Sequence, residues 1–454
     1  MKKTSSPAPL PPAFAERIRM QYPDDAEALL CSLERPPVPS VQLHPFKHHQ
    51  RFYDAPAVPW YAAGRMLESR PSFTFDPFFH SGAYYPQESS SMFIGWLLAQ
   101  YAGGRKDLKV LDLCASPGGK SLLLLNALGP GGTLIANEIH PERNAVLRQN
   151  LMRWGIPRYI VTRAEARQFA DAGITFDVVL TDAPCSGEGM FRKDPQARTE
   201  WSTQQVFACA RRQSDILQDA RYLLREGGLL VYSTCTFSPE ENEEQCRFIG
   251  SNPLFEPFRP GCPDSFPVRV LDEDRFHGYA FLPHIAPGEG FFASAFIFRG
   301  STENPRTDQR RLNHTSAIPP PPGFSVSPGD DLIWSEGTQG QRYISPFSTA
   351  EIEELSRHVR VTSPGHPAGI DKDKKLFIPH HGLSMIQSMA DTQPSVQADE
   401  ETALRYLRGH SLAQLPDAPL GWVIIRYKEA ALGWVKNVNG RANNLYPDAL
   451  RIRT

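Results

Sequence analysis

The chain lacks any apolar run near the roughly 20 residues that a membrane-spanning helix needs. Residues 1–12 hold prolines and serines where a secretory signal would carry an apolar stretch. Its seven cysteines have neither CxxC nor Cys/His ligand spacing, which argues against a zinc site and a disulfide scaffold. We therefore expect a cytoplasmic, reduced chain with no metal and no membrane partner.

A strong overall charge is also lacking. The formal net charge is −2, with 41% hydrophobic and 22% charged residues, as in an ordinary globular protein. Because a nucleic-acid binder needs a local basic surface, this total neither favours nor excludes RNA. At 454 residues the chain is long enough for about three domains.

The pattern along the chain predicts four parts. Residues 1–70 mix a short helical pattern with proline-rich connections, and 71–300 alternate apolar runs with amphipathic helices. Residues 301–323 are polar, end in a proline run and predict a linker. Residues 324–454 form the remainder, in which 421–427 and 431–438 are strand-like and the last 34 residues carry six Lys/Arg against two acids.

Residues 71–300 predict an α/β fold. Five apolar runs have the character of buried strands: 108–113, 132–137, 159–162, 176–181 and 229–233. Helical patterns separate them, notably 121–128, 141–154 and 204–224. This alternation predicts βαβ units and a Rossmann-like parallel sheet covered on both faces.

A glycine turn follows the first predicted strand. It comprises Cys114, Ala115, Ser116, Pro117, Gly118, Gly119 and Lys120. Ligands of such sheets bind beyond the carboxyl ends of the strands, and glycines let the backbone approach a ligand closely. The order is neither GxGxxG nor a P-loop, so a nicotinamide or phosphate-cradling site is disfavoured.

Acidic residues end the next three strands. Glu138 is placed to accept the ribose hydroxyls of an adenosine, Glu165 to meet an adenine amino group, and Asp182 ends the fourth strand. Any one of them alone is as well explained as a solvated loop residue. Three at consistent strand ends predict a cofactor site.

Two cysteines, Cys185 and Cys235, also follow strand ends. A buried structural thiol is the commoner explanation for one cysteine, but a pair at successive strand ends favours chemistry. Ser238 and Glu241 match a capping box with Pro239 at the first helical position, which predicts a helix starting three residues after Cys235. Its positive end would favour a thiolate at Cys235, an argument that does not extend to Cys185.

These motifs resemble the Sun-type RNA (cytosine-5)-methyltransferases, and in particular the bacterial RsmF branch that modifies 16S ribosomal RNA. Cys114–Lys120, Asp182–Gly189 and Ser233–Glu243 are similar to that family's cofactor loop, Pro-Cys loop and Thr-Cys loop. The similarity covers nearly the whole chain. The C-terminal part, with 421–423, 433–436 and 443–447, resembles the branch's PUA-like RNA-binding module.

The resemblance implies a methyl transfer from S-adenosylmethionine to C5 of cytosine. Cys235 would add to C6, Asp182 would hold the base edge, and Cys185 would assist release. Lys120 would lie near the base and cofactor, and the less favoured alternative is a helix-start lysine facing solvent. RNA, 16S rRNA or the 30S subunit, is the expected partner of a monomeric chain.

Some residues depart from the family or carry weaker expectations. Glu165 stands where aspartate is common, and Gln42 and His44 stand where arginine and asparagine are usual, which puts the N-terminal RNA contacts in question. Arg192 is a candidate for a phosphate contact or for a plain surface residue, as is its neighbour Lys193. Two tryptophans, Trp422 and Trp434, are candidates for base stacking, although strand tryptophans are more often core.

Other functions remain open at this point. One alternative keeps the same chemistry but has DNA, transfer RNA or another RNA as the substrate. A second alternative, of a different class, is a non-catalytic RNA-binding or ribosome-assembly factor with a relic cofactor fold. DNA cytosine methyltransferases use the Pro-Cys cysteine, so the second cysteine, Cys235, favours RNA.

Overall fold

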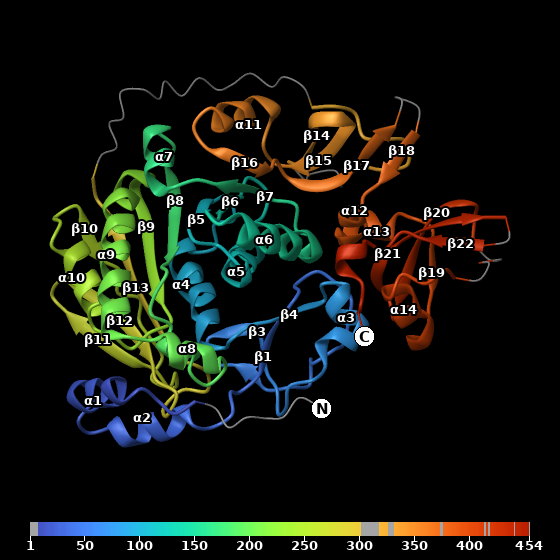
Figure 1. The fold of residues 1–454 in the computed structure, drawn as a ribbon. Coiled ribbons are helices and arrows are strands. Elements are labelled where there is room, and N and C mark those ends of the chain that lie inside the picture. The colour runs from blue at the N-terminus through green and yellow to red at the C-terminus, as the bar shows by residue number, and fades with distance from the viewer. Residues whose placement is uncertain are drawn as a thin grey trace.

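The computed structural model describes residues 8–300, 317–325, 331–372, 376–412, 415, 418–439 and 441–453. Most of the predicted linker 301–323 lies outside these described residues. Figure 1 shows a central sheet with helices on both sides and smaller sheets from the two ends of the chain around it.

The central sheet has ten strands in the order β11-β12-β13-β9-β8-β5-β6-β7-β16, with β10 paired to β13. The middle strands β9, β8, β5, β6 and β7 are parallel to one another. They are β5 Lys109–Asp112, β6 Thr133–Asn137, β7 Tyr159–Arg163, β8 Phe176–Asp182 and β9 Leu224–Thr234. All five predicted strands and the α/β alternation are thus confirmed.

Antiparallel strands extend the sheet beyond β9. They are β10 Phe255–Pro257, β11 Arg269–Glu273, β12 Phe276–Phe281 and β13 Phe291–Phe298. These strands were not predicted, because they follow one another without helical spacers and so give no βαβ signal.

Successive residues of each central strand enter two different cores. Val110 packs into the cluster on one face and Leu111 into the cluster on the other, as the period of two along a strand requires. The first face is covered by α4 Phe93–Ala102, α5 Gly119–Ala127 and α6 Pro141–Trp154. The second is covered by α7 Ala166–Asp171, α9 Thr203–Ala220 and α10 Glu243–Gly250.

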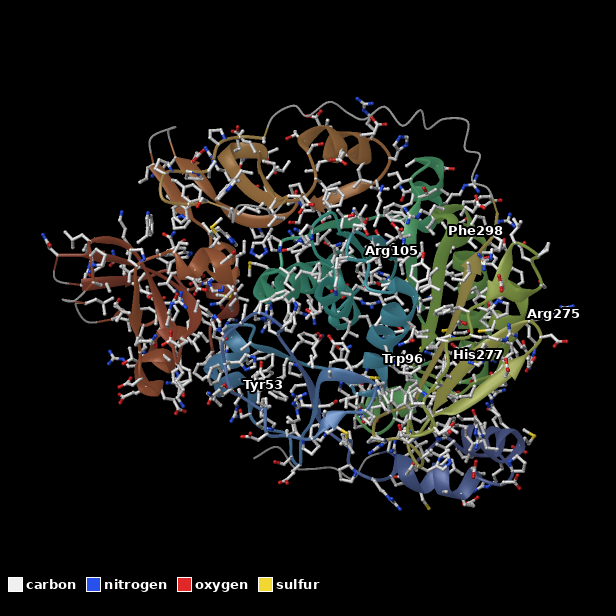
Figure 2. The ribbon with its side chains drawn as sticks, turned by 180° about the vertical axis from the view of Figure 1, so that it is seen from behind. Tyr53, Trp96, Arg105, Arg275, His277 and Phe298 are labelled. Carbon is white, nitrogen blue, oxygen red and sulfur yellow. The ribbon has the colours of Figure 1, made fainter. Side chains whose placement is uncertain are left out.

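Two details of these helices matter. The predicted helix 204–224 ends at Ala220, because 221–223 tighten into a 3₁₀ turn that leads directly into β9. On α4, Trp96 stacks on Phe93 and meets Tyr279 of β12 edge-on, so aromatic rings fill the first core beside His277 (Figure 2).

The N-terminal segment is not purely helical. It begins with α1 Pro12–Gln21 and α2 Ala26–Leu33, which match the predicted helical pattern. A four-stranded antiparallel sheet follows, in the order β2-β3-β1-β4, with the short helix α3 Pro77–His80 beside it. Its strands are β1 Ser40–Leu43, β2 Ala57–Val58, β3 Tyr61–Met66 and β4 Tyr84–Pro86.

The C-terminal part contributes to three sheets. One has the order β14-β15-β17-β18, formed by Ile333–Glu336, Gln341–Ser345, His366–Lys372 and Leu376–Pro379. Strand β16 Arg360–Ser363, preceded by α11 Thr349–Ser356, instead joins the central sheet beside β7.

The last sheet has the order β19-β20-β21-β22, and its central pair confirms both predicted C-terminal strands. It comprises Ser395–Gln397, Gly421–Tyr427, Ala430–Val438 and Arg441–Asn444. Helices α12 His381–Met385, α13 Gln387–Asp391 and α14 Glu400–Leu407 accompany it. One apolar cluster joins this sheet to the N-terminal sheet, so the two ends of the chain pack together (Figure 1).

In the part of the chain that the structure describes, no helix has the length and apolar character to cross a membrane.

Candidate active site

The glycine turn Cys114–Lys120 lies where β5 ends and α5 begins, at the carboxyl edge of the sheet. Gly118 is the N-cap of α5 with φ +116°, a left-handed conformation that a side chain disfavours. The turn is therefore backbone-lined just where the sequence predicts a bound cofactor.

Three strand ends and α6 fix this turn. The Asn137 amide donates to the carbonyls of Leu113 and Ala164, and so ties the ends of β5, β6 and β7 together. From α6, the Asn150 amide donates to the Pro117 carbonyl at 2.8 Å. The Ser116 hydroxyl donates to the Arg143 carbonyl at 2.9 Å, and the Arg143 guanidinium donates to the Ser116 carbonyl at 3.0 Å. The turn is thus held in place by its neighbours.

The two strand-end acids predicted to hold an adenosine differ in surroundings. Glu138 is buried, accepts from the His140 amide at 2.9 Å and lies 3.4 Å from Arg143. Glu165 is exposed at the N-cap of α7, where its side chain closes a capping box with Gln168. Glu138 therefore has a fixed carboxylate beside the turn, whereas Glu165 serves as a helix cap.

Asp112, the last residue of β5, is fully buried under the same turn. Its Oδ2 accepts from Ser121, but its Oδ1 has no hydrogen-bond partner among the described residues. Burial raises the pKa of this carboxyl to about 7. An orphaned buried acceptor beside a glycine turn fits a site that a polar ligand completes.

The two cysteines come together. The Sγ atoms of Cys185 and Cys235 lie 3.3 Å apart, and the Cys235 amide points to the Cys185 sulfur at 3.4 Å. The Gly189 amide donates to the Cys235 carbonyl at 2.8 Å, which ties the two loops directly. Hydrogen bonding to Cys235, then burial, raises the pKa of the Cys185 thiol.

The Lys120 side chain is mostly buried instead of facing solvent. Its Nζ donates to Asp182 Oδ2 at 2.9 Å, and Ser233 Oγ donates to the other oxygen of the same carboxylate at 2.8 Å. Burial by itself lowers the pKa of the ammonium, but Asp182 and Cys235 outweigh it and hold the pKa above its usual value. Lys120 and Asp182 thus lie at the same carboxyl edge as the sulfur pair, with Ser233 of β9 joining Asp182 to the strand that leads to Cys235.

The predicted capping box at Ser238 and Glu241 is wrong. Residues 239–242 form turns, and the helix α10 begins at Glu243, eight residues after Cys235. The Glu241 carboxylate instead accepts from the amide and hydroxyl of Ser186, at 2.9 and 2.5 Å, and from the Gln213 amide at 3.0 Å. Burial raises the pKa of Glu241 to about 7.

A second buried glutamate makes a similar bridge. Glu188, in the loop after Cys185, accepts from the Phe237 amide, the Ser238 hydroxyl and the Trp201 indole at 2.8–2.9 Å. Two carboxylates of the two loops therefore pin the cysteines at their short separation. Neither role was predicted from the sequence, although Glu188 lies in the Pro-Cys loop and Glu241 in the Thr-Cys loop.

Helix α1 packs against the loops that follow Cys185 and Cys235. Phe14 packs edge-on against Phe191 and Trp201, and Arg17 pairs with Glu240 at 2.6 Å. The Gln21 side chain donates to the Phe237 carbonyl. The N-terminal helices thus buttress the cysteine pocket.

Several weaker expectations are now decided. Gln42 is buried and donates to the Gly119 carbonyl at 3.1 Å, so it holds the glycine turn. His44 is buried against Trp154. Arg192 is not a surface residue for phosphates, because its buried guanidinium donates to the carbonyls of Gly288 and Pro36.

The two tryptophans differ. Trp434 is a core residue whose indole donates to the His380 carbonyl, so it cannot stack on a base. Trp422 is half-buried with the Lys436 ammonium 5.3 Å from its ring centroid.

Comparison with known families matches three stretches of the chain. Residues 102–297 match the model described as 16S rRNA methyltransferase RsmB/F. Residues 10–89 match the N-terminal domain of 16S rRNA methyltransferase RsmF, and 393–452 match the methyltransferase RsmF PUA domain.

Curated relatives align over most of their length. A ribosomal RNA small subunit methyltransferase F from Citrobacter koseri is 30% identical over 82% of this chain and 78% of its own. One from Erwinia tasmaniensis is 28% identical over 97% of this chain and 96% of its own.

Solved structures share the fold of the larger part. A methyltransferase homolog protein from Pyrococcus horikoshii superposes with a TM-score of 0.54 and 25% identity, over 63% of this chain and 94% of its own. NSun6 from the same organism, solved with SFG, has a TM-score of 0.55 and 19% identity, over 64% and 99%. At that identity the second match speaks for the fold alone.

Proposed function

This chain belongs to the ribosomal RNA small subunit methyltransferase F family and is an S-adenosylmethionine-dependent RNA cytosine-5 methyltransferase, and we propose that it acts on 16S rRNA through a covalent adduct of Cys235. The observation that carries this proposal is the contact of Cys185 with Cys235 at the sheet edge where Lys120 of the glycine turn pairs with Asp182.

The residues of the turn fit the cofactor. We assign its binding to the backbone of Cys114–Gly119 and to the buried carboxyl groups of Glu138 and Asp112, with Glu165 at the adenine end. When bound, S-adenosylmethionine supplies an electrophilic methyl group and leaves as S-adenosylhomocysteine.

Cys235 activates the base. Cytosine C5 is a poor nucleophile until a thiolate adds to C6. In this step the Sγ–C6 bond forms, and the C5=C6 π pair becomes available at C5, where the new C–C bond to the methyl group is made. Asp182 bonds the N3/N4 edge and holds the ring in place while charge builds on it.

The choice of Cys235 over Cys185 rests on the resemblance of Ser233–Glu243 to the family's Thr-Cys loop, because the helix after Cys235 begins only at Glu243. Hydrogen bonding to Cys235, then burial, raises the pKa of the Cys185 thiol, so Cys185 stays protonated beside Cys235. One sulfur is thus suited to attack and the other to donate.

Release reverses the addition. The C5 proton passes to water, the C5–H electron pair restores the C5=C6 bond, and the C6–Sγ bond breaks with its pair returning to Cys235. A thiol at 3.3 Å donates a hydrogen bond to that departing thiolate, which is the role we assign to Cys185.

A target cytosine has to leave its stack to enter such a pocket. We propose that 16S rRNA or the 30S subunit supplies it and that the enzyme works as a monomer in the cytoplasm. The local basic surplus at 421–454 supports a sequence-independent grip on phosphates.

Methyl transfer with labelled cofactor tests this function. Purified protein is offered 16S rRNA, assembled 30S particles, transfer RNA and duplex DNA separately, and bisulfite mapping locates the product. Label in 16S rRNA or 30S particles at a cytosine supports the proposal. Label only in transfer RNA or DNA refutes the substrate, and cofactor binding without transfer to any of them supports a non-catalytic RNA-binding factor.

A further inference from the structure

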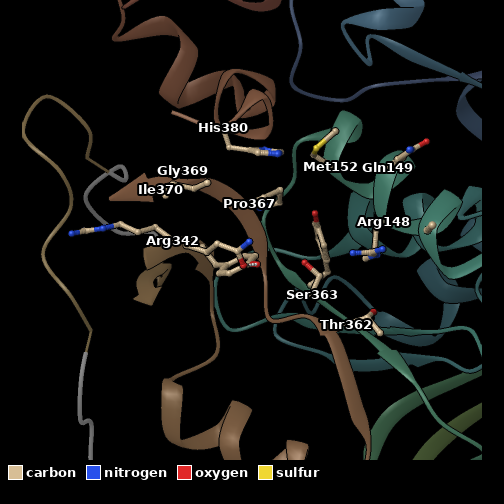
Figure 3. A pocket seen from close by; sticks show the side chains of 14 residues that line it. Arg148, Gln149, Met152, Arg342, Thr362, Ser363, Pro367, Gly369, Ile370 and His380 are labelled. Carbon is tan, nitrogen blue, oxygen red and sulfur yellow. Dashed lines mark hydrogen bonds between the residues drawn. The ribbon is translucent and has the colours of Figure 1, made fainter. Parts of the chain in front are cut away.

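A groove separates helix α6 from the strands β15, β16 and β17 (Figure 3). It consists of two cavities of about 340 and 310 Å³ that share Arg148 and Thr362 in their walls. We call it the α6–β16 groove. The smaller cavity also carries Arg163 and Arg360 and has no acidic residue in its wall.

Arg163 and Arg360 are directly opposite each other in the antiparallel pair β7–β16. Like charges in that position repel and weaken a sheet. Arg148, exposed on α6, adds a third guanidinium to the same wall. In the ranges that the structure describes, none of the three is in ion-pair contact with a carboxylate.

Two neighbouring arginines, in contrast, do have carboxylate partners. In the larger cavity, Arg342 pairs with Asp371 at 2.5 Å, and on α6 Arg143 lies 3.4 Å from Glu138. Three unpaired guanidiniums around one cavity form a site for an anion, and their planar forks match phosphate oxygens.

The groove is preformed. The Thr362 hydroxyl of β16 lies within hydrogen-bond distance of two acceptors, the Asn144 side-chain oxygen of α6 at 2.9 Å and the Val161 carbonyl at 3.2 Å. These contacts fix the two walls without using the arginines. An anion would therefore meet charges that are already in position.

The groove opens at the edge of the sheet that carries the chemistry. Arg163 ends β7, and Arg360 begins the antiparallel β16, so both lie at the carboxyl edge. From β9, which leads to Cys235, to β16 there are five strand spacings, roughly 24 Å at about 4.8 Å each. A polynucleotide with one base at Cys235 spans that distance with a few of its phosphates.

We propose that the α6–β16 groove binds backbone phosphates of the substrate RNA through Arg148, Arg163 and Arg360. This rests on the proposed RNA methyltransferase function, and it adds a binding site between the core and the C-terminal part. Phosphate contacts of this kind position the RNA without reading its sequence.

The test uses the full chain and a 16S rRNA transcript. Arg163→Ala/Arg360→Ala removes the repelling pair, and Arg357→Ala removes an exposed charge that pairs with Glu354 on neighbouring α11. We expect the double variant to raise the Kd for RNA about 10- to 100-fold and to lower the log–log salt slope by about 1–2 units. In the double variant the KM for RNA should rise, whereas kcat at saturating RNA should stay within about twofold of the wild-type value. The Arg357→Ala variant should match the wild type in both quantities.

Folding is checked in the same preparation. Because the substitution relieves repulsion, the Tm of the double variant without RNA should equal or exceed that of the wild type. Binding and salt slope equal to those of Arg357→Ala would overturn the proposal. Inorganic phosphate is also added to both proteins. If it raises the Tm of the wild type but not of the double variant, and the RNA affinity of the two proteins is equal, the groove is a free-phosphate site and the proposal is overturned.

The two proposals fail in different ways. A wild-type enzyme that transfers no methyl group to 16S rRNA refutes the proposed function. An enzyme that methylates 16S rRNA but binds it equally well with and without Arg163 and Arg360 refutes only the groove.

Discussion

The sulfurs of Cys185 and Cys235 are 3.3 Å apart although 50 residues separate them in the chain. Parallel pairing of β8 with β9 brings both strand ends to one edge. Two buried carboxylates, Glu188 and Glu241, then join the loops that follow. The cysteine pair is therefore built by the sheet and locked by the loops.

Asp182→Asn tests the polar side of the pocket. The substitution keeps the shape but removes the charge that pairs with Lys120, so the base edge and the ammonium both lose their partner. We expect kcat to fall about 10²- to 10³-fold. Single-turnover methylation at saturating substrates measures it, with the exposed Asp171→Asn as control. A loss below about threefold would contradict the role of Asp182.

Glu138→Gln tests the cofactor site. Its carboxylate is buried beside the glycine turn, and a neutral amide presents a donor where two ribose hydroxyls would donate. We expect the Kd for S-adenosylmethionine, measured by calorimetry, to rise about 10- to 100-fold. Glu142→Gln, in the exposed first turn of α6, is the matched control and should bind as the wild type does.

Glu241→Gln tests a positioning residue. An amide cannot accept from all of Ser186 and Gln213, so the Cys185 loop should loosen against the Cys235 loop. We expect kcat to fall about tenfold, while the Kd for the cofactor is unchanged. A merely structural role would instead lower the thermal stability and affect both quantities together.

A pH dependence of stability follows from Glu289. Burial raises its pKa to about 7 although the Arg192 guanidinium, 3.7 Å from its Oε2, lowers it. Between about pH 4.5 and 7 the unfolded chain releases this proton while the folded chain retains it. The free energy of unfolding therefore falls as pH rises through that window, by up to about 3 kcal/mol for this group.

The substitution Glu289→Gln should remove the part of the pH-dependent fall in the free energy of unfolding that Glu289 causes. Denaturant unfolding at pH 5 and pH 8 measures the difference, with the exposed Glu226→Gln as control. Equal falls in the Glu289 variant and the wild type would show that the carboxyl is not held protonated.

Local patterns predicted the central strands and the residues at their ends. Periodic apolar runs specify β5 to β9, and parallel topology brings Glu138, Asp182 and Cys235 to one edge. The assignment of the helix after Cys235 failed because Ser238 and Glu241 have stronger partners in the loop after Cys185. Such non-local hydrogen bonds leave no trace in a local capping pattern.

The N-terminal sheet was missed for a related reason. Strands of two to six residues between prolines carry little periodic signal, and Gln42 is buried in β1 because it bonds Gln87 and the Gly119 carbonyl. Likewise, β16 belongs by sequence to the C-terminal part but completes the central sheet at β7. Pairings of distant segments had to come from the structure.

The covalent adduct is the most direct test of the mechanism. Cys185→Ala enzyme is incubated with 16S rRNA and S-adenosylmethionine and resolved under denaturing conditions. We predict an RNA–protein species that survives denaturation in Cys185→Ala and is absent from Cys235→Ala and from the double variant. An adduct that persists in Cys235→Ala, or undiminished methylation by that variant, would contradict Cys235 as the nucleophile.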